Sequence, residues 1–141
     1  MIIDASVVID AVADSQERGN AARAALASIP ASEPLLAPGH LPIEVMSGLM
    51  AAANRPGHPF EPTMIEEALR RAAGLAVSVE ATPWSDVARA WELARASMRY
   101  SDAVYVATAE RHATTLLTAD ARIARSGARI RCNIQTIQPG D

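Results

Sequence analysis

Short apolar runs alternate along the chain with longer segments in which apolar residues recur at helical spacing. The apolar runs end at polar residues, Gly or Pro, and they predict strands at residues 2–3, 35–37, 76–81, 115–118 and 130–137. The longer segments predict helices at residues 6–12, 17–28, 40–54, 63–73, 85–96, 101–112 and 121–126. Strands and helices in this order predict an α/β fold with a parallel sheet covered by helices on both faces.

Local signals refine the ends of these elements. Ser6 can cap the first helix, and Thr63 with Glu66 forms a capping-box pattern at the start of the helix at 63–73. The stretch 54–62 contains three prolines and one glycine, which predicts a loop between two helices. Such a loop is short for a domain linker, so we expect a single domain that spans residues 1–141.

Composition narrows the class of protein. Half of the residues are hydrophobic and 21% are charged, which is typical of a globular domain. Cys132 is the only cysteine, so an intrachain disulfide and Cys-based zinc sites are excluded, and a reducing compartment is favoured. The chain has no apolar run of the roughly 20 residues that a membrane span needs and no signal-peptide pattern after Met1. We therefore expect a cytoplasmic protein without a membrane partner.

The charge is unevenly distributed. The formal net charge of −3 weakly disfavours a nucleic-acid partner. All 13 basic residues are arginines, and several of them crowd the last third of the chain: Arg111, Arg122, Arg125, Arg129 and Arg131. Guanidinium groups pair well with phosphate oxygens. These arginines are either phosphate contacts or ordinary solvated surface charges.

Two aspartates follow predicted strands. Asp4 ends the apolar run at 2–3, and Asp120 comes two residues after the run at 115–118. Either residue alone fits a turn or a helix cap, which are positions that Asp favours. Ligands of parallel α/β sheets collect beyond the carboxyl ends of the strands, so the two carboxylates can meet there if their strands are neighbours. Like charges held together are costly, and a divalent cation is the usual means of neutralising them.

Two further acids lie on predicted helices. Glu44 has Gly48 and Ala51 as neighbours on its helix face, and small residues there leave room for a cleft, although a solvent-facing Glu is the default interpretation. Asp102 lies in the first turn of its helix, where the helix dipole favours an acid in any protein. The apolar residues that follow Asp102 nevertheless predict a buried helix, and a buried helix rarely carries an uncompensated acid.

Together these acids indicate a metal site. Four carboxylates without a cysteine pair suit Mg²⁺ or Mn²⁺ rather than zinc. Such an ion can activate a water and neutralise a phosphodiester during in-line attack. The candidate catalytic and metal-binding residues are therefore Asp4, Glu44, Asp102 and Asp120.

The same residues carry a resemblance to a known family. The chain resembles the PIN-domain nucleases and, more narrowly, the VapC toxins of type II toxin–antitoxin modules. The resemblance covers the whole chain in order and spacing, and the segment 101–107 is its most specific part. The segments that carry it are Asp-Ala-Ser at 4–6, Pro-Ile-Glu-Val at 42–45, Ser-Asp-Ala-Val-Tyr-Val-Ala at 101–107 and Leu-Thr-Ala-Asp at 117–120.

This resemblance implies a three-layer α/β/α sandwich in which the four acids bind Mg²⁺ or Mn²⁺. It also implies an endoribonuclease that cuts structured RNA such as tRNA or rRNA, forms a homodimer, and is neutralised by a small antitoxin with a DNA-binding segment. Ser6 and Thr118 match polar positions beside the acids that orient carboxylates or waters. We expect Arg122 and Arg125, beside Asp120, to contact the RNA. Some relatives carry a further acid just after the position of Asp120. This chain has Ala, Arg and Ile at 121–123 instead, so the resemblance leaves the binding of a second metal ion open.

Other features are interpreted as structural. His40, His58 and His112 lack the mutual spacing of a helical metal site and are interpreted as surface or loop residues. Trp84 and Trp91 lie seven residues apart on one helix face, which fits packing or a dimer interface. The apolar stripe of Leu41, Val45 and Leu49 fits either the core or a groove for the amphipathic tail of an antitoxin.

Two alternatives to a nuclease fit parts of this pattern. A phosphorelay receiver is also a small α/β domain with clustered aspartates, but it needs a paired acid after its first strand and a lysine near its last strand. This chain has a lone Asp4 and no lysine, so that alternative is rejected. A PIN-like domain that has lost catalysis and serves as a binding module stays open, although all four acids are present.

Overall fold

The computed structural model describes residues 1–140 and has the parallel α/β architecture that the sequence predicts. Five short strands are formed: β1 (Ile2–Ile3), β2 (Leu36–Pro38), β3 (Ser78–Glu80), β4 (Leu116–Thr118) and β5 (Ile134–Thr136). The helices described are α1 (Ala5–Ala13), α2 (Glu17–Ala27), α3 (Leu41–Ala53), the 3-10 helix η1 (Pro62–Met64), α4 (Ile65–Gly74), α5 (Trp84–Ala94) and α6 (Tyr100–Arg111).

The sheet has the strand order β3-β2-β1-β4-β5, and each neighbouring pair is parallel. β1 lies in the centre, with Ile2 opposite Leu36 of β2 and opposite Leu116 of β4. The chain therefore leaves β1 toward one side of the sheet and later returns to its other side. This reversal of strand order beside β1 is the place where α/β sheets bind ligands.

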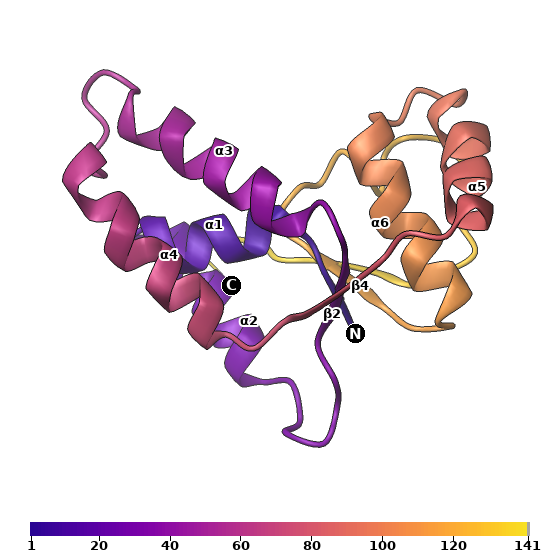
Figure 1. Ribbon diagram of the computed structural model, residues 1–141, viewed down its shortest axis with the longest axis horizontal. Coiled ribbons are helices and arrows are strands. Elements are labelled where there is room, and N and C mark those ends of the chain that lie inside the picture. Colours follow the sequence, from indigo (N-terminus) through magenta and orange to yellow (C-terminus); the bar gives the residue numbers. More distant parts are fainter. Residues whose placement is uncertain (141) are drawn as a thin grey trace.

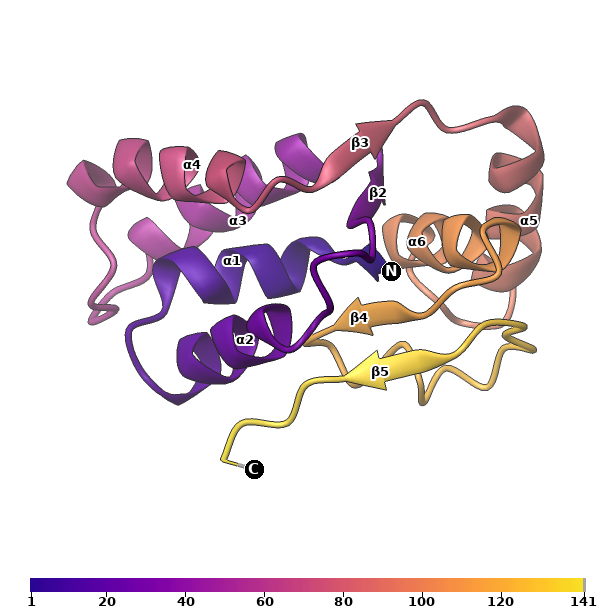
Figure 2. The ribbon, with the colours of Figure 1, turned by 90° about the horizontal axis from the view of Figure 1, so that it is seen from below.

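Helices cover both faces of the sheet, as Figures 1 and 2 show. Helices α1 to α4 lie together on one side, where α1 contacts the other three, and α5 packs along α6 on the other side. The strands are too short to be stable alone, and burial between the two helical layers stabilises them. Ile2, Ile3, Leu116 and Leu117 are all fully buried. The expected three-layer sandwich is confirmed.

The helix α6 is the most deeply buried element of the second layer. Every residue from Asp102 to Ala109 is buried, which agrees with the apolar pattern that follows Asp102 in the sequence. On the opposite layer, α3 approaches α1 closely at Gly48, where an added Cβ would come within 2.3 Å of Ile9 Cδ1. Gly48, four residues after Glu44, thus lets the middle of α3 lie close against α1.

Several local expectations are corrected. The helix expected at 121–126 does not form; these residues make successive turns, in which the N–H of Ile123 donates to the carbonyl of Asp120 and the N–H of Ser126 to the carbonyl of Ile123, each three residues back. The Thr63–Glu66 capping box is also wrong, since Thr63 lies inside η1 and the α-helix begins later, at Ile65. Ser6 does not cap α1; its hydroxyl is used elsewhere, and Asp4 is the N-cap residue.

The apolar stripe on α3 belongs mainly to the core. Leu41, Val45 and Leu49 are 5%, 3% and 0% exposed, and they belong to the central hydrophobic cluster. Leu41 and Val45 also border a small apolar pocket of about 230 Å³ between α1, α3, α4 and β3. No helix within residues 1–140 has both the length and the apolar character to cross a bilayer.

Candidate active site

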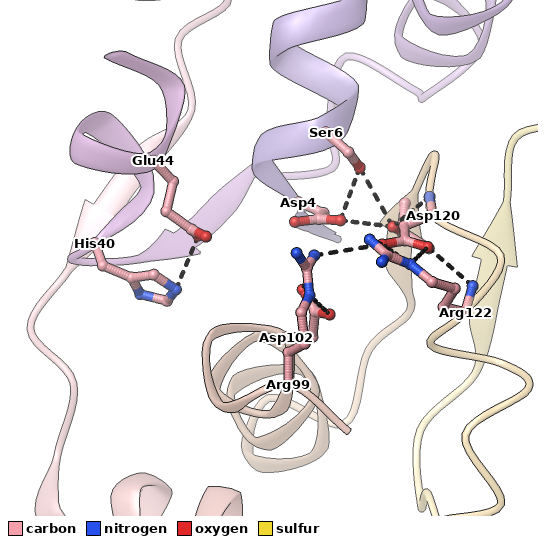
Figure 3. Close-up of polar contacts among 9 residues, drawn as sticks. Asp4, Ser6, His40, Glu44, Arg99, Asp102, Asp120 and Arg122 are labelled. Atoms are coloured by element: carbon pink, nitrogen blue, oxygen red, sulfur yellow. Dashed lines mark hydrogen bonds and ion pairs between the residues drawn. The ribbon is translucent and has the colours of Figure 1, made fainter. Parts of the chain in front are cut away.

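Parallel pairing brings two of the predicted acids to one edge of the sheet. Asp4 follows β1 directly and Asp120 lies two residues beyond β4. Because Ile3 pairs with Leu117 in parallel register, the carboxyl ends of β1 and β4 coincide. The N–H of Asp4 donates to the carbonyl of Leu117 at 3.0 Å, which continues the pairing up to the site. Figure 3 shows both side chains at this edge, with Asp102 reaching it from the start of α6.

Two hydroxyls fix the carboxylate of Asp4. Thr118 Oγ1 and Ser6 Oγ donate to the same oxygen, Asp4 Oδ2, at 2.6 and 2.7 Å. The same hydroxyls accept backbone N–H groups of the turn after β4, from Asp120 to Thr118 Oγ1 and from Ala119 to Ser6 Oγ, both at 3.0 Å. Each hydroxyl thus uses its proton on Asp4 and its lone pair on the turn. Asp4 is locked to the segment that carries Asp120.

Burial makes the charge of Asp4 costly. Its side chain is only 4% exposed, and desolvation raises its pKa above the usual range. The hydroxyl groups of Thr118 and Ser6 oppose this rise, whereas the nearby charges of Asp102 and Glu44 add to it. The fold therefore holds a buried acid beside other acids, and no arginine within residues 1–140 pairs with it.

Two arginines neutralise the other aspartates. Arg99, just before α6, donates from Nε and Nη2 to the two oxygens of Asp102 at 2.9 and 3.2 Å. Its Nη2 also lies 3.4 Å from Asp120 Oδ2. Arg122 reaches the Asp120 carboxylate from the other side, with Nη2 to Oδ2 at 2.7 Å (Figure 3). Hydrogen bonding and charge from Arg122, followed by the charge of Arg99, keep the pKa of Asp120 below its usual range.

Arg99 is a site residue that the sequence patterns did not identify. A signal existed, because Arg99 and Asp102 are three residues apart at a helix start, which is the spacing of a helical ion pair. That spacing is common in surface helices and does not by itself identify a site. The sequence predicts Arg122 as an RNA contact; in the structure its guanidinium lies on Asp120.

Glu44 stands apart from the three aspartates. It lies in the first turn of α3, and its carboxylate points toward Asp4 from the far side of the site (Figure 3). His40 Nε2 lies 3.0 Å from Glu44 Oε1, and the His40 ring packs on the Tyr105 ring with centroids 4.7 Å apart. Burial raises the pKa of Glu44, but contacts with His40 and Tyr105 outweigh it, so the pKa is lowered overall. His40 lies in the turn before α3 with a partly exposed side chain, as its interpretation as a surface or loop residue expects, but its contacts with Glu44 and Tyr105 go beyond that interpretation.

Three buried polar atoms around Glu44 lack a hydrogen-bond partner in the described part of the chain. They are His40 Nε2, Glu44 Oε1 and the Tyr105 hydroxyl. Of these, His40 Nε2 and Glu44 Oε1 face each other at 3.0 Å. Buried polar groups are normally paired, and orphans that gather beside an acid cluster fit a site that receives a hydrated ligand or ion.

The residues of the site offer the oxygen atoms that a hard divalent cation prefers, but their side chains do not converge on one point. Carboxylate oxygens are the donors that Mg²⁺ and Mn²⁺ prefer, and Asp4 has no positive partner among the described residues. Within residues 1–140, however, no three His, Cys, Asp or Glu side chains converge closely enough to hold a metal ion. Asp102 and Asp120 are turned toward guanidinium groups, and Glu44 toward His40. A cation here would be held by the acids only after these pairings are exchanged.

The chain matches the family model of the PIN domain over residues 1–128. It is 33% identical over 126 residues to Ribonuclease VapC3 of Mycobacterium tuberculosis, strains CDC 1551 / Oshkosh and ATCC 25618 / H37Rv. That similarity covers 89% of this chain and 86% of the relative.

Three solved structures have the same fold. VapC20 of Mycobacterium tuberculosis, described as a Sarcin-Ricin loop cleaving toxin, has a TM-score of 0.65 at 20% identity and covers 90% of this chain and 95% of its own. A toxin-antitoxin complex from Klebsiella pneumoniae gives 0.66 at 20% identity, with coverages of 96% and 95%. VapBC2 from Rickettsia felis, bound to a promoter DNA fragment, gives 0.69 at 9% identity, with coverages of 97% and 98%.

Proposed function

The chain belongs to the PIN-domain family and is a relative of the VapC proteins, and we propose that it is a metal-dependent endoribonuclease toxin. The observation that carries this proposal is the buried acid Asp4, whose neighbours in the described structure are acids and hydroxyls rather than an arginine. A ribonuclease among its relatives points to the phosphodiester bond of RNA as the target. The reaction would be hydrolysis within a structured RNA such as tRNA or rRNA.

Asp4, Asp102 and Asp120 would hold Mg²⁺ or Mn²⁺, with Glu44 on the far side. When bound, such an ion supplies activation of a water and neutralisation of the phosphodiester charge. Ser6 and Thr118 keep Asp4 Oδ2 in place, so that its other oxygen is left for a ligand. The turn after Asp120 carries Ala, Arg and Ile at 121–123, and this lack of a further acid favours one ion over two.

RNA would approach from the side of Asp120, where Arg122 and Arg125 are exposed. One bound Mg²⁺ would change the formal charge of −3 to about −1, which reduces the repulsion of phosphates. Arg18 and Arg23 are engaged elsewhere, with Asp10 and with backbone carbonyls.

Alanine at both 122 and 125 should therefore weaken RNA binding more than alanine at both 18 and 23. The double variant at 122 and 125 should also reduce the log–log salt slope, by about one unit for each phosphate that an arginine no longer neutralises. Titration of a labelled RNA at several salt concentrations measures both quantities. Equal falls in RNA affinity for the two double variants would contradict this assignment.

A small antitoxin would bind this chain as its partner, as the toxin-antitoxin complexes among its structural neighbours suggest. The amphipathic tail of this antitoxin would bind in the apolar pocket that Leu41 and Val45 border together with Leu69 and Val77. A guanidinium from the partner could fork onto the acids and compete with the metal ion. Calorimetry of the pair with and without excess Mn²⁺ tests this: an affinity unchanged by Mn²⁺ would mean that the antitoxin blocks RNA elsewhere.

We also propose a homodimer. Exposed apolar side chains gather on two helices, with Ile43 and Met50 on α3 and Trp84 and Trp91 on α5. Trp84 is 86% exposed, which is unusual for so large an apolar side chain and fits an interface with a second subunit. Sedimentation of wild type and of a Trp84→Arg variant tests this interface, since the variant should be monomeric.

The alternative function is a PIN-like binding module without catalysis. A single experiment decides between the two: purified protein is incubated with total RNA and with defined tRNA and rRNA fragments, in EDTA and in Mg²⁺ or Mn²⁺. Discrete cleavage that appears only with the divalent ion supports the nuclease. RNA binding without cleavage under every metal condition would support the binding module.

A further inference from the structure

Arg99 lies across two of the acids that would hold the metal ion. Its Nε–H donates to Asp102 Oδ2 at 2.9 Å and its Nη2 to Asp102 Oδ1 at 3.2 Å, while Nη2 also reaches Asp120 Oδ2 at 3.4 Å. One guanidinium therefore joins carboxylates from α6 and from the turn after β4. Figure 3 shows its guanidinium between Asp102 and Asp120.

The two sides of this contact differ in exposure. The Asp102 and Asp120 side chains are 8% and 15% exposed and come from segments fixed by the core, whereas the Arg99 side chain is 60% exposed. Ion pairs with one exposed, flexible partner are weak and are easily exchanged. Asp102 and Asp120 thus stay in place when the guanidinium leaves.

Arg122 has a more local role. It is two residues from Asp120, its contacts run to that one carboxylate, and its backbone N–H is bound to the same group. Of these two arginines, Arg99 is the one that bridges two acids. The positive charges of Arg99 and Arg122 also repel each other. Removal of Arg99 therefore opens the centre of the site, whereas removal of Arg122 frees one edge of it.

We propose that Arg99 is an exchangeable counter-ion, which occupies the acids when no metal ion is bound and binds a phosphate of the RNA when an ion displaces it. The inference rests on the proposed function above. The acids cannot serve the guanidinium and a divalent ion with the same oxygens, so the two compete. The aliphatic stem keeps the displaced guanidinium at the rim of the site, and its planar fork suits phosphate oxygens.

Competition and release have opposite consequences for the two ligands. Without Arg99, the metal ion enters without displacing a cation, so it should bind more tightly. In wild type, the Arg99 guanidinium becomes free for an RNA phosphate only once the ion is bound. A variant without Arg99 lacks this contact, so with the ion bound it should bind RNA more weakly than wild type does. In the wild type, the two ligands should therefore help each other by thermodynamic linkage. A residue with a merely structural role would not move the two affinities in opposite directions.

The first measurement is Mn²⁺ binding by calorimetry on the full chain without RNA, for wild type, Arg99→Gln and the control Arg95→Gln. Arg95 is also exposed, four residues away, and makes no ion pair within residues 1–140, so its variant loses the same charge. We expect Arg99→Gln to bind Mn²⁺ about fivefold more tightly than wild type and Arg95→Gln to stay within about twofold. Equal Mn²⁺ affinities for the two variants would overturn the proposal.

The second measurement is RNA binding in EDTA and in Ca²⁺, which also takes oxygen ligands, with RNA integrity checked on a gel. Wild type should gain affinity for RNA with Ca²⁺ by a larger factor than Arg99→Gln, and Arg95→Gln should gain as much as wild type. An equal gain for all three proteins would overturn the release of Arg99 to phosphate. Wild type that binds Mn²⁺ but cleaves no RNA would instead contradict the proposed function, and wild type that binds no Mn²⁺ would overturn both.

Discussion

Asp4 and Asp86 are equally buried, at 4% exposure, but their surroundings differ. Asp86 lies in the first turn of α5, and Arg111 of α6 places Nε 3.1 and 3.0 Å from its two oxygens. Arg111 also contacts Glu80, so these charges form a closed group that ties α5 and α6 to β3. Asp4 instead receives the hydroxyls of Ser6 and Thr118.

The difference lies in how the charge is neutralised. The charge of a buried acid that has its own arginine is already neutralised within the protein. A buried acid beside other acids has no such partner, so its charged form is costly in free energy. Under the proposed function, the second arrangement is the one that would receive a cation. Burial alone does not distinguish the two; the identity of the neighbours does.

The largest expected effect separates the two aspartates by activity. Asp4→Asn keeps the shape of the side chain but removes the charge that attracts the ion, and Asp102→Asn acts likewise. Each variant should lose RNA cleavage by more than about a hundredfold, since even residues behind metal ligands commonly cost 10- to 100-fold. Asp86→Asn should cleave at the wild-type rate per folded molecule, within about twofold. Normal cleavage by Asp4→Asn in Mg²⁺ would end the site assignment.

The next largest effect on cleavage tests the hydroxyl groups that contact Asp4, which within residues 1–140 has no arginine partner of the kind that Asp86 has. Thr118→Val keeps the volume but removes the 2.6 Å bond to Asp4 Oδ2 and the acceptor for the Asp120 N–H. We expect cleavage to fall about 10- to 100-fold, with weaker Mn²⁺ binding. Thr108→Val is the control, because Thr108 is equally buried but binds only the carbonyl of Val104 within α6. Similar activity losses in both variants would indicate a general packing effect.

A smaller effect concerns stability on the Asp86 side. Asp86→Asn leaves Arg111 with one fewer charged partner, although Glu80 and solvent still reach it. The free energy of unfolding in urea should fall by about 1–3 kcal/mol. Glu92→Gln serves as the control, because that acid is exposed in its pair with Arg89 and should cost little. An unchanged stability of Asp86→Asn would mean that the buried pair contributes nothing.

The smallest effect is a gain of stability in Asp4→Asn, opposite to the loss expected for Asp86→Asn, and it depends on pH. The pKa of Asp4 is raised in the folded state, so the folded state binds this proton more tightly than the unfolded state, and stability is lost as pH rises above the ordinary value of 3.8. In EDTA at neutral pH, Asp4→Asn should therefore be more stable than wild type by an amount on the order of 1 kcal/mol. The difference should vanish below pH 3.8 and shrink in Mg²⁺. Urea unfolding across this pH range measures it, and a constant difference at all pH values would contradict the assigned cause.

Particular residues show how far the sequence could be used. The position of Asp4 and Asp120 at one edge of the sheet is predictable, because each follows an apolar run and the parallel order of strands and helices brings such ends together. Ser6 was found at its position but was also given the wrong role of a helix cap, because that is the common use of Ser there. Arg99 was missed, since a pair three residues apart at a helix start looks the same in a site and on a surface. The helix expected at 121–126 is replaced by successive turns, although the Arg122 N–H donates to the Asp120 carboxylate as it would at a helix cap, so the local pattern is the same for both outcomes.

The sequence by itself determined the alternation of strands and helices, the parallel sheet and the acids that end at its edge, because these depend on local periodicity and on the short reach of the connections. Only the tertiary structure decided which buried acid has an arginine and which does not, since Arg111 meets Asp86 from 25 residues away and Thr118 meets Asp4 from 114. Contacts at such separations depend on how the layers pack, and local patterns carry no record of them. The difference between Asp4 and Asp86 is therefore a property of the fold.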